Sequence, residues 1–405
     1  MYAERMKRLA VAMKNANLDA VFVSNQKNIQ YLTGIRAMMA GNVQPFGDPE
    51  GFAVIRNGRC EVLCDGRYFA EVDAHDGVSA RLLNAPVSAQ EIATRLRESL
   101  GGAAKRIGYE SDALTYADAR DLMALTPELA WEPAEKVVTS LRHCKGADEI
   151  ALLRKAQKIT SDCFEHICGW IRVGMSERDV AFEIDSYLRK HSEGSSFNPI
   201  VAFGETGCHP HYTPSPTRKL KSGQMVLLDF GAIHNGYCGD LTRMLVMGKA
   251  NKRHHEVYDL VLAAQQKCLD GIRAGMKCHD ADALCRDFFR TMGCDEAFKH
   301  GTGHGVGLAI HEPPTLKRTV ETILQPGMVV TVEPGLYYED WGGVRIEDMI
   351  VITEKGHTNL TTCPKKLREI GARAVSSAKV RSATKRFGKK RAVGKARRAT
   401  SRGKK

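Results

Sequence analysis

The sequence lacks the features of a membrane or secreted protein. No apolar run in its 405 residues approaches the ~18 residues that a membrane-spanning helix needs. The first ten residues interleave charged and apolar side chains, without the continuous apolar stretch of a secretory signal. The twelve cysteines form no Cys-x-x-Cys pair, which argues against a disulfide scaffold and a zinc ribbon, so most should be small buried hydrophobes. We therefore expect a cytoplasmic protein without a membrane partner.

Several common catalytic motifs are also missing. The chain contains neither the Gly-x-Ser-x-Gly of serine hydrolases nor a nucleotide-binding P-loop. The glycine series that starts at Gly301 has Val306 where the dinucleotide fingerprint ends in glycine. The His-Glu pair at His311 is followed by Thr315, where a zincin protease needs its second histidine. None of these four sites is therefore predicted.

Acidic residues are absent from the last 35 positions. Residues 371–405 hold fourteen Lys or Arg, whereas the first 370 residues carry 45 basic and 47 acidic side chains. The net charge of +12 therefore comes from this segment. Its Lys, Arg, Ala, Gly and Ser composition predicts a disordered tail. Such a tail could give weak, sequence-independent contact with nucleic acid, or be a solvated segment without a partner.

The rest of the chain is long enough for two domains. A helical apolar stripe near the N-terminus, short strands at 20–23, 52–55 and 61–63, and a helix at 89–100 predict an α/β unit for residues 1–135. Residues 136–370 should form the second domain. Its predicted helices start near Asp148, Ser176, Tyr258 and Ala281, and strands alternate with Gly-rich loops from Phe197 onward.

A predicted β-hairpin carries the first candidate metal ligands. Asn235-Gly236 between two apolar stretches is typical of a two-residue type I′ turn. That turn places Asp229 opposite Thr242, so that Asp240 shares the face of Asp229. Two carboxylates on one apolar face repel each other unless a cation or a proton compensates them. The alternative is a bulge that turns Asp240 to solvent.

A second pair of strands, at 328–333 and 344–352, carries further carboxylates. Pro334 cannot donate to a ladder and should end the first strand at Glu333. The second strand places Glu347 mid-strand, with Arg345 on the same face. The pattern does not decide between Glu347 and Asp348, and an ion pair with an arginine is the alternative to a metal. The intervening residues 337–343 read as a turn.

Histidines in glycine- and proline-rich segments complete the candidate site. The alternating glycines from Gly301 to Gly307 would let the backbone and His304 approach a centre closely. His209 and His211 lie in a loop that follows a predicted strand, where a histidine taken alone is more often a surface residue.

Taken together and in this order, these motifs resemble the pita-bread metallopeptidase family. This family contains aminopeptidase P, prolidase, methionine aminopeptidase and the metal-free creatinase. The resemblance covers about residues 1–370 and implies an α/β N-terminal domain of the creatinase type. It also implies an α+β catalytic domain with a curved antiparallel sheet and two helix pairs. Residues 15–24 and 28–34 are similar to the extra domain of the proline-specific members, which argues against methionine aminopeptidase.

The resemblance implies a complete set of metal ligands, which argues against creatinase: Asp229, Asp240, His304, Glu333 and Glu347. Four carboxylates balance the charge of two divalent ions. Two-metal sites generate a nucleophile at neutral pH and stabilise the oxyanion of an attacked carbonyl. The oxygen-rich set with one histidine favours Mn²⁺, with Co²⁺, Fe²⁺ and Zn²⁺ as alternatives.

The same resemblance implies roles for five side chains. His211 and His311 would assist the scissile peptide and the tetrahedral intermediate by hydrogen bonding and proton transfer. Glu333 would be both ligand and general base. His300 and Arg345 would orient the ligands or the substrate, Arg345 by holding a neighbouring carboxylate.

The predicted activity is hydrolysis of the bond between an N-terminal residue and proline, by a homodimer. Residues 205–213 look more like aminopeptidase P and residues 301–308 more like prolidase, so the choice between the two stays open. The alternatives are an aminopeptidase of another specificity, such as methionine removal, and a peptidase-fold scaffold that binds nucleic acid through its basic tail.

Overall fold

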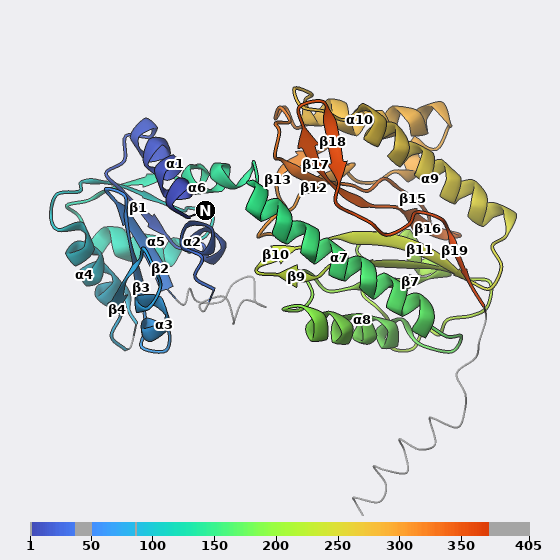
Figure 1. The fold of residues 1–405 in the computed structure, drawn as a ribbon, viewed down its shortest axis with the longest axis horizontal. Helices are drawn as coiled ribbons and strands as arrows, with labels where there is room; N and C mark the ends of the chain where they lie inside the picture. The colour runs from blue at the N-terminus through green and yellow to red at the C-terminus, as the bar shows by residue number, and fades with distance from the viewer. Residues whose placement is uncertain (1, 37–50, 86, 372–405) are drawn as a thin grey trace, which may run out of the picture.

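The computed structural model describes residues 2–36, 51–85 and 87–371. They form a smaller N-terminal α/β domain and a larger C-terminal domain, joined by the segment that leads into the long helix α7 (Figure 1). Among these residues, no helix has both the length and the apolar character to cross a membrane. Apart from Gly371, the predicted tail lies outside the described residues.

The N-terminal domain is built on a six-stranded mixed sheet in the order β4-β3-β2-β1-β5-β6. Ala20 and Phe22 of the central strand β1 belong to a different buried cluster from Val21 and Val23, because successive side chains point to opposite sheet faces. Burial on both faces explains the continuous apolar run that predicted this strand. The strands are β1 (Ala20–Val23), β2 (Gly51–Arg56), β3 (Arg59–Cys64), β4 (Ser79–Leu82), β5 (Arg106–Tyr109) and β6 (Ala130–Pro133).

Helices cover both faces of this sheet (Figure 1). The predicted helix at 89–100 is confirmed, and the Ser88 side chain caps it by accepting from the Glu91 N–H. The sequence analysis missed the helix at 26–33, which has no polar stripe because its residues from Asn28 to Thr33 are all buried. The helices are α1 (Tyr2–Asn15), α2 (Gln26–Thr33), α3 (Phe69–Asp73), α4 (Ala89–Leu100), α5 (Tyr116–Leu125) and α6 (Glu135–Thr139).

The C-terminal domain contains a four-stranded sheet, β19-β11-β8-β7, and a five-stranded sheet, β13-β12-β14-β17-β18. The pairs in these sheets are antiparallel, as expected, except that the short strand β19 pairs parallel with β11. The strands are β7 (Ile200–Phe203), β8 (Met225–Phe230), β9 (Ile233–His234), β10 (Tyr237–Cys238), β11 (Leu241–Met247), β12 (Gly303–Gly305), β13 (Glu312–Leu316), β14 (Val329–Val332), β15 (Gly335–Tyr338), β16 (Gly342–Arg345), β17 (Asp348–Thr353), β18 (Gly356–Asn359) and β19 (Arg368–Ile370).

Two helix pairs flank these sheets, as expected: α7 (Ala147–Trp170) with α8 (Glu177–His191), and α9 (Lys252–Gly271) with α10 (Cys278–Thr291). The first pair packs on one face of the β7–β8–β11 sheet, and the second pair shares a core with the other face and with β14 and β17. Helix α9 begins six residues before the predicted Tyr258, because the Asn251 side chain caps it by accepting from the His254 N–H at 2.9 Å.

One buried apolar cluster runs through both domains. It contains Leu9 and Ile29 from the N-terminal domain together with Tyr237, Val306 and Val329 from the C-terminal domain. The predicted domain boundary after residue 135 falls at the start of α6 and stays a prediction. The prediction that most cysteines are buried is confirmed for nine of the twelve.

Candidate metal centre

The first hairpin has the predicted register. His234 pairs with Tyr237 across the turn, and Thr242 pairs with Asp229. The two turn residues Asn235 and Gly236 have φ values of 50° and 79°, as a type I′ turn requires.

Asp240 lies between β10 and β11 and is 4% exposed, so the alternative in which it turns to solvent is wrong. Its backbone is fixed by Gln157 of α7. The Asp240 N–H donates to Gln157 Oε1 at 2.9 Å, and Gln157 Nε2 donates to the Asp240 carbonyl at 2.7 Å.

The second hairpin differs from the prediction in two places. Residues 337–338 and 342–343 are paired strand rather than turn, since β15 and β16 continue the ladder beyond Pro334. Glu347 is not mid-strand but in the break between β16 and β17, where its N–H donates to the Thr242 carbonyl at 3.2 Å. Glu347 faces the other candidate ligands, whereas Asp348 pairs with Arg243 at 2.7 Å and Lys365 at 2.9 Å.

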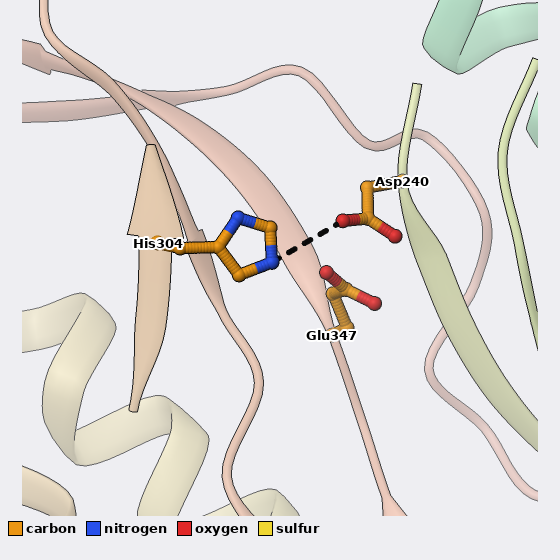
Figure 2. A group of neighbouring side chains, drawn as sticks. All are labelled: Asp240, His304 and Glu347. Atoms are coloured by element: carbon orange, nitrogen blue, oxygen red, sulfur yellow. Dashed lines mark ion pairs between the residues drawn. The ribbon is translucent and has the colours of Figure 1, made fainter. Parts of the chain in front are cut away.

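His304 on β12 faces three carboxylates. Its Nε2 lies 3.2 Å from Glu333 Oε1 and 3.6 Å from Asp240 Oδ2, and its Nδ1 is 3.1 Å from the Gly305 carbonyl. Because a carbonyl only accepts, Nδ1 carries the proton there and Nε2 is the nitrogen directed at the centre. Figure 2 shows His304 of β12 converging with Asp240, which precedes β11, and Glu347, which precedes β17, and the ligand atoms of the three residues lie within 4.8 Å of one another.

Glycines allow this approach, as predicted for the segment around His304. A Cβ on Gly303 would lie 2.0 Å from the Thr331 carbonyl oxygen, and one on Gly305 would lie 2.3 Å from the Glu312 carbonyl oxygen. Only glycine therefore lets β12 lie between β13 and β14 and hold His304 in place.

The electrostatics of the centre favour a bound cation. Burial and neighbouring carboxylates raise the pKa of Asp240 and Glu347, and burial raises the pKa of Asp229 despite Arg345. Burial opposes ionisation of Glu333 as well, but its hydrogen bond from His304 lowers its pKa to about 2. In the same contact the pKa of His304 is raised to about 9, although burial acts against this.

Two buried oxygens in the centre, Asp229 Oδ1 and Glu347 Oε1, have no hydrogen-bond partner among the described residues. Unpaired buried carboxylate oxygens are costly in a folded protein. A bound cation would pair these oxygens. The carboxylates and the imidazole of the centre are ligands that suit hard or borderline divalent ions.

Arg345 positions two of these carboxylates. It forms an ion pair with Asp229 Oδ2, and its Nε donates to Thr242 Oγ1 at 3.0 Å. Thr242 Oγ1 in turn donates to Glu347 Oε2 at 2.8 Å. An ion pair with an arginine was the alternative to a metal at Glu347, but Arg345 forms its ion pair with Asp229 instead. This pair leaves Asp229 Oδ1 without a hydrogen-bond partner among the described residues.

His300 is one step removed from the carboxylates. Its Nδ1 is 2.7 Å from the Gly301 carbonyl and therefore carries the proton, so Nε2 accepts from the Tyr337 hydroxyl at 2.8 Å. Tyr337 accepts in turn from Arg345 Nη1 at 2.8 Å. Burial lowers the pKa of His300, which is consistent with a neutral imidazole.

His311 and His211 are both exposed. The His311 ring stands edge-on to His304 with 4.4 Å between centroids. Burial and the charge of His304 lower the pKa of His311, and His211 adds to this effect. His211, in the loop after the 3-10 helix η3 (Gly204–Cys208), therefore acts electrostatically on the same region.

Four side chains that support the ligands were missed: Gln157, Thr242, Thr331 and Tyr337. Thr331 Oγ1 donates to Glu333 Oε1 at 3.0 Å and accepts from the His304 N–H at 3.0 Å. For Thr242 a signal existed, because the predicted register already placed it opposite Asp229. Gln157 had none, since its contact with Asp240 spans 83 residues.

Comparisons with known proteins identify two sequence families along the chain. The profile of metallopeptidase family M24 matches residues 151–354, and that of the creatinase/prolidase N-terminal domain matches residues 5–144. A Xaa-Pro dipeptidase from Pyrococcus horikoshii is 30% identical over 365 residues, which cover 90% of this chain and 98% of the relative.

Solved structures with the same two domains are also similar. A Xaa-Pro dipeptidase from Bacillus anthracis has a TM-score of 0.82 at 35% identity, covering 91% of this chain and all of that one. An X-Pro aminopeptidase from Thermotoga maritima has a TM-score of 0.79 at 27% identity, covering 89% of this chain and all of that one. The predicted architecture, an α/β domain followed by a pita-bread domain, is thus confirmed.

Proposed function

We propose that this chain, which belongs to metallopeptidase family M24, hydrolyses the peptide bond between an N-terminal residue and proline. The observation that carries this proposal is the convergence of Asp240, His304 and Glu347, together with two buried oxygens, Asp229 Oδ1 and Glu347 Oε1, that have no hydrogen-bond partner in the described part of the chain. The relatives named Xaa-Pro dipeptidase and X-Pro aminopeptidase support the specificity for proline.

The proposed cofactor is a pair of divalent ions, Mn²⁺ in preference to Co²⁺, Fe²⁺ or Zn²⁺. When bound, the ions would supply a nucleophile at neutral pH and stabilise the oxyanion of the attacked carbonyl. The residues that would hold them are Asp229, Asp240, His304, Glu333 and Glu347.

The chain's own side chains would supply the proton transfers. Glu333 is the proposed general base, because the family resemblance assigns this role to it and its carboxylate lies within the ligand set, 3.2 Å from His304 Nε2. His311 and His211 would donate hydrogen bonds to the scissile peptide and assist proton transfer. Arg345 and His300 would position the ligands, Arg345 directly and His300 through Tyr337.

Hydrolysis of Xaa-Pro and Xaa-Pro-Yaa peptides by chelated protein, with and without added Mn²⁺, tests this function. We expect Mn²⁺ to restore cleavage and Asp240→Asn to abolish it, while the exposed Asp259→Asn serves as the matched control. The ratio of dipeptide to tripeptide cleavage then assigns the enzyme to the prolidase or the aminopeptidase P type. Absence of cleavage of both peptides with every divalent ion, or cleavage of Met-Ala alone, would contradict the proposal.

The fourteen Lys or Arg of residues 371–405 support a secondary proposal, sequence-independent binding of nucleic acid. Affinity for duplex DNA should fall steeply with salt and vanish when the chain is truncated after residue 370, while Asp240→Asn leaves it unchanged. Binding that survives truncation would contradict this proposal. The homodimer expected by resemblance is checked separately by light scattering.

A further inference from the structure

A buried carboxylate next to His311 takes no part in the proposed centre. Glu312 begins β13 and is 8% exposed. It forms ion pairs with two cations from the segment between the domains, with Arg142 at Oε2 and with Lys145 at Oε1, the latter at 2.8 Å. The side chains of Arg142 and Lys145 are 6% and 1% exposed, so all three charges are removed from water.

The ion pairs continue into the N-terminal domain. Arg142 Nη1 donates to Asn28 Oδ1 on α2 at 2.9 Å. Asn28 Nδ2 donates to Glu110, which follows β5 and also accepts from the backbone N–H groups of Ser24 at 2.7 Å and Asn25 at 2.6 Å. Glu312 is therefore anchored to the framework of the other domain and not only to its own strand.

Glu312 also fixes the loop that joins His304 to His311. Its Oε2 accepts from the Ala309 N–H at 3.3 Å. A Cβ on Gly307 would lie 2.3 Å from its Oε1, so the loop backbone rests directly on the carboxylate. His304 and His311, at the two ends of this loop, face each other with 4.4 Å between ring centroids.

Stability alone does not account for this arrangement. Removing three charges from water is costly, and well-packed apolar side chains of similar size often give equal or greater stability. An ionic cluster instead imposes a defined geometry, because each charge must keep its partners to stay buried.

We propose that Glu312 is a positioning residue, which together with Arg142 and Lys145 holds the 305–310 loop so that His311 stands beside His304. The N-terminal domain thereby sets the position of His311 through Asn28 and Arg142. This inference rests on the proposed role of His311 in peptide hydrolysis.

The test compares Glu312→Gln, His311→Ala and the double variant in the full-length protein loaded with Mn²⁺. Glu312→Gln should lower kcat by about 10- to 100-fold with little change in KM, since a displaced catalytic group mainly affects the chemical step. In the His311→Ala background the same change should cost less than about twofold, because the group that Glu312 positions is already absent. Equal losses in both backgrounds would overturn the proposal.

Hydrogen exchange provides a readout that does not depend on activity. Exchange in peptides that cover residues 305–311 should be faster in Glu312→Gln than in the parent protein, with protection elsewhere unchanged. Arg142→Lys keeps the charge but cannot bond to Asn28 and Glu312 together, so exchange of residues 305–311 should increase less than in Glu312→Gln. This variant provides the test if Glu312→Gln fails to fold. Glu61→Gln, which removes one of the two carboxylates that pair with Arg81 in the N-terminal domain, is the matched control.

The two readouts separate the two hypotheses. If the parent protein cleaves neither peptide, the proposed function fails while the exchange data still report on the loop. If exchange in residues 305–311 is unchanged in both variants, the positioning role is wrong whether or not the protein is a peptidase.

Discussion

The side chain of Arg345 bonds to three groups around the metal centre: Asp229, Thr242 and Tyr337. A lysine could satisfy only part of this set from a single ammonium group. We predict that Arg345→Lys weakens Mn²⁺ binding by about 10- to 100-fold, the usual effect of removing a residue that orients metal ligands. Metal titration of the chelated protein measures this loss. Arg253→Lys is the control, and equal affinities in the two variants would contradict the prediction.

Protons compete with metal for the same side chains. The pKa of His304 is raised to about 9, and those of Asp240 and Glu347 are raised as well, whereas Glu333, at about 2, is already ionised. Below its raised pKa each of the first three groups holds a proton that must leave before a cation binds.

We therefore predict that Mn²⁺ affinity rises with pH up to about 9, by about tenfold per pH unit for the proton that His304 releases. Calorimetric titrations in two buffers of different ionisation enthalpy count these protons. An affinity that is constant across this range would show that the side chains are already deprotonated in the metal-free protein.

Among the structural elements, the first hairpin was the most predictable. The Asn235-Gly236 turn fixes the pairing of Asp229 with Thr242 through local chemistry alone. The second hairpin was predicted less well, because no local signal reveals that the ladder continues past Pro334 through β15 and β16. The position of Glu347 depends on a break between strands that a tertiary contact to Thr242 stabilises, so its strand pattern could not show it.

Strand β12 lies closely packed between β13 and β14. In Gly303→Ala the added Cβ would lie 2.0 Å from the Thr331 carbonyl oxygen and force the two strands apart. We expect a loss of about 1–3 kcal/mol in the free energy of unfolding, together with weaker metal binding through His304. Urea denaturation measures the first effect.

Gly169→Ala is the matched control for this substitution. Gly169 lies within helix α7, and a Cβ there would meet no atom of the described residues within 4 Å apart from its own helix backbone and chain neighbours. This variant should be as stable as the parent protein or more stable by up to about 1 kcal/mol. A Gly303→Ala protein of parent stability would show that β12 can shift without cost.

At the scale of the whole molecule, the two-domain plan followed from resemblance to a known family, but the contact between the domains did not. Apolar periodicity reports which face of an element is buried and not what covers it. The shared cluster that includes Leu9, Ile29 and Tyr237 joins residues more than 100 positions apart, and so do the ion pairs of Arg5 with Glu149 and of Arg142 with Glu312. These pairings could be established only from the structure.

The pair of Arg5 and Glu149 shows how closely the domains depend on each other. Arg5 Nη2 lies 3.3 Å from Glu149 Oε2 and 3.2 Å from the Tyr237 hydroxyl, and both charged side chains are at most 6% exposed. Arg5→Met leaves the Glu149 carboxylate buried without its cation, so we predict a loss of about 3–5 kcal/mol in the free energy of unfolding. Lys7→Met on the same helix removes a pair whose side chains are 78% and 70% exposed, and should change stability by less than about 1 kcal/mol. Denaturant unfolding of the two variants checks the difference. Equal stabilities of Arg5→Met and Lys7→Met would show that the domains are held together by apolar contacts alone. Since the apolar cluster spans both domains, the parent protein should unfold in one transition.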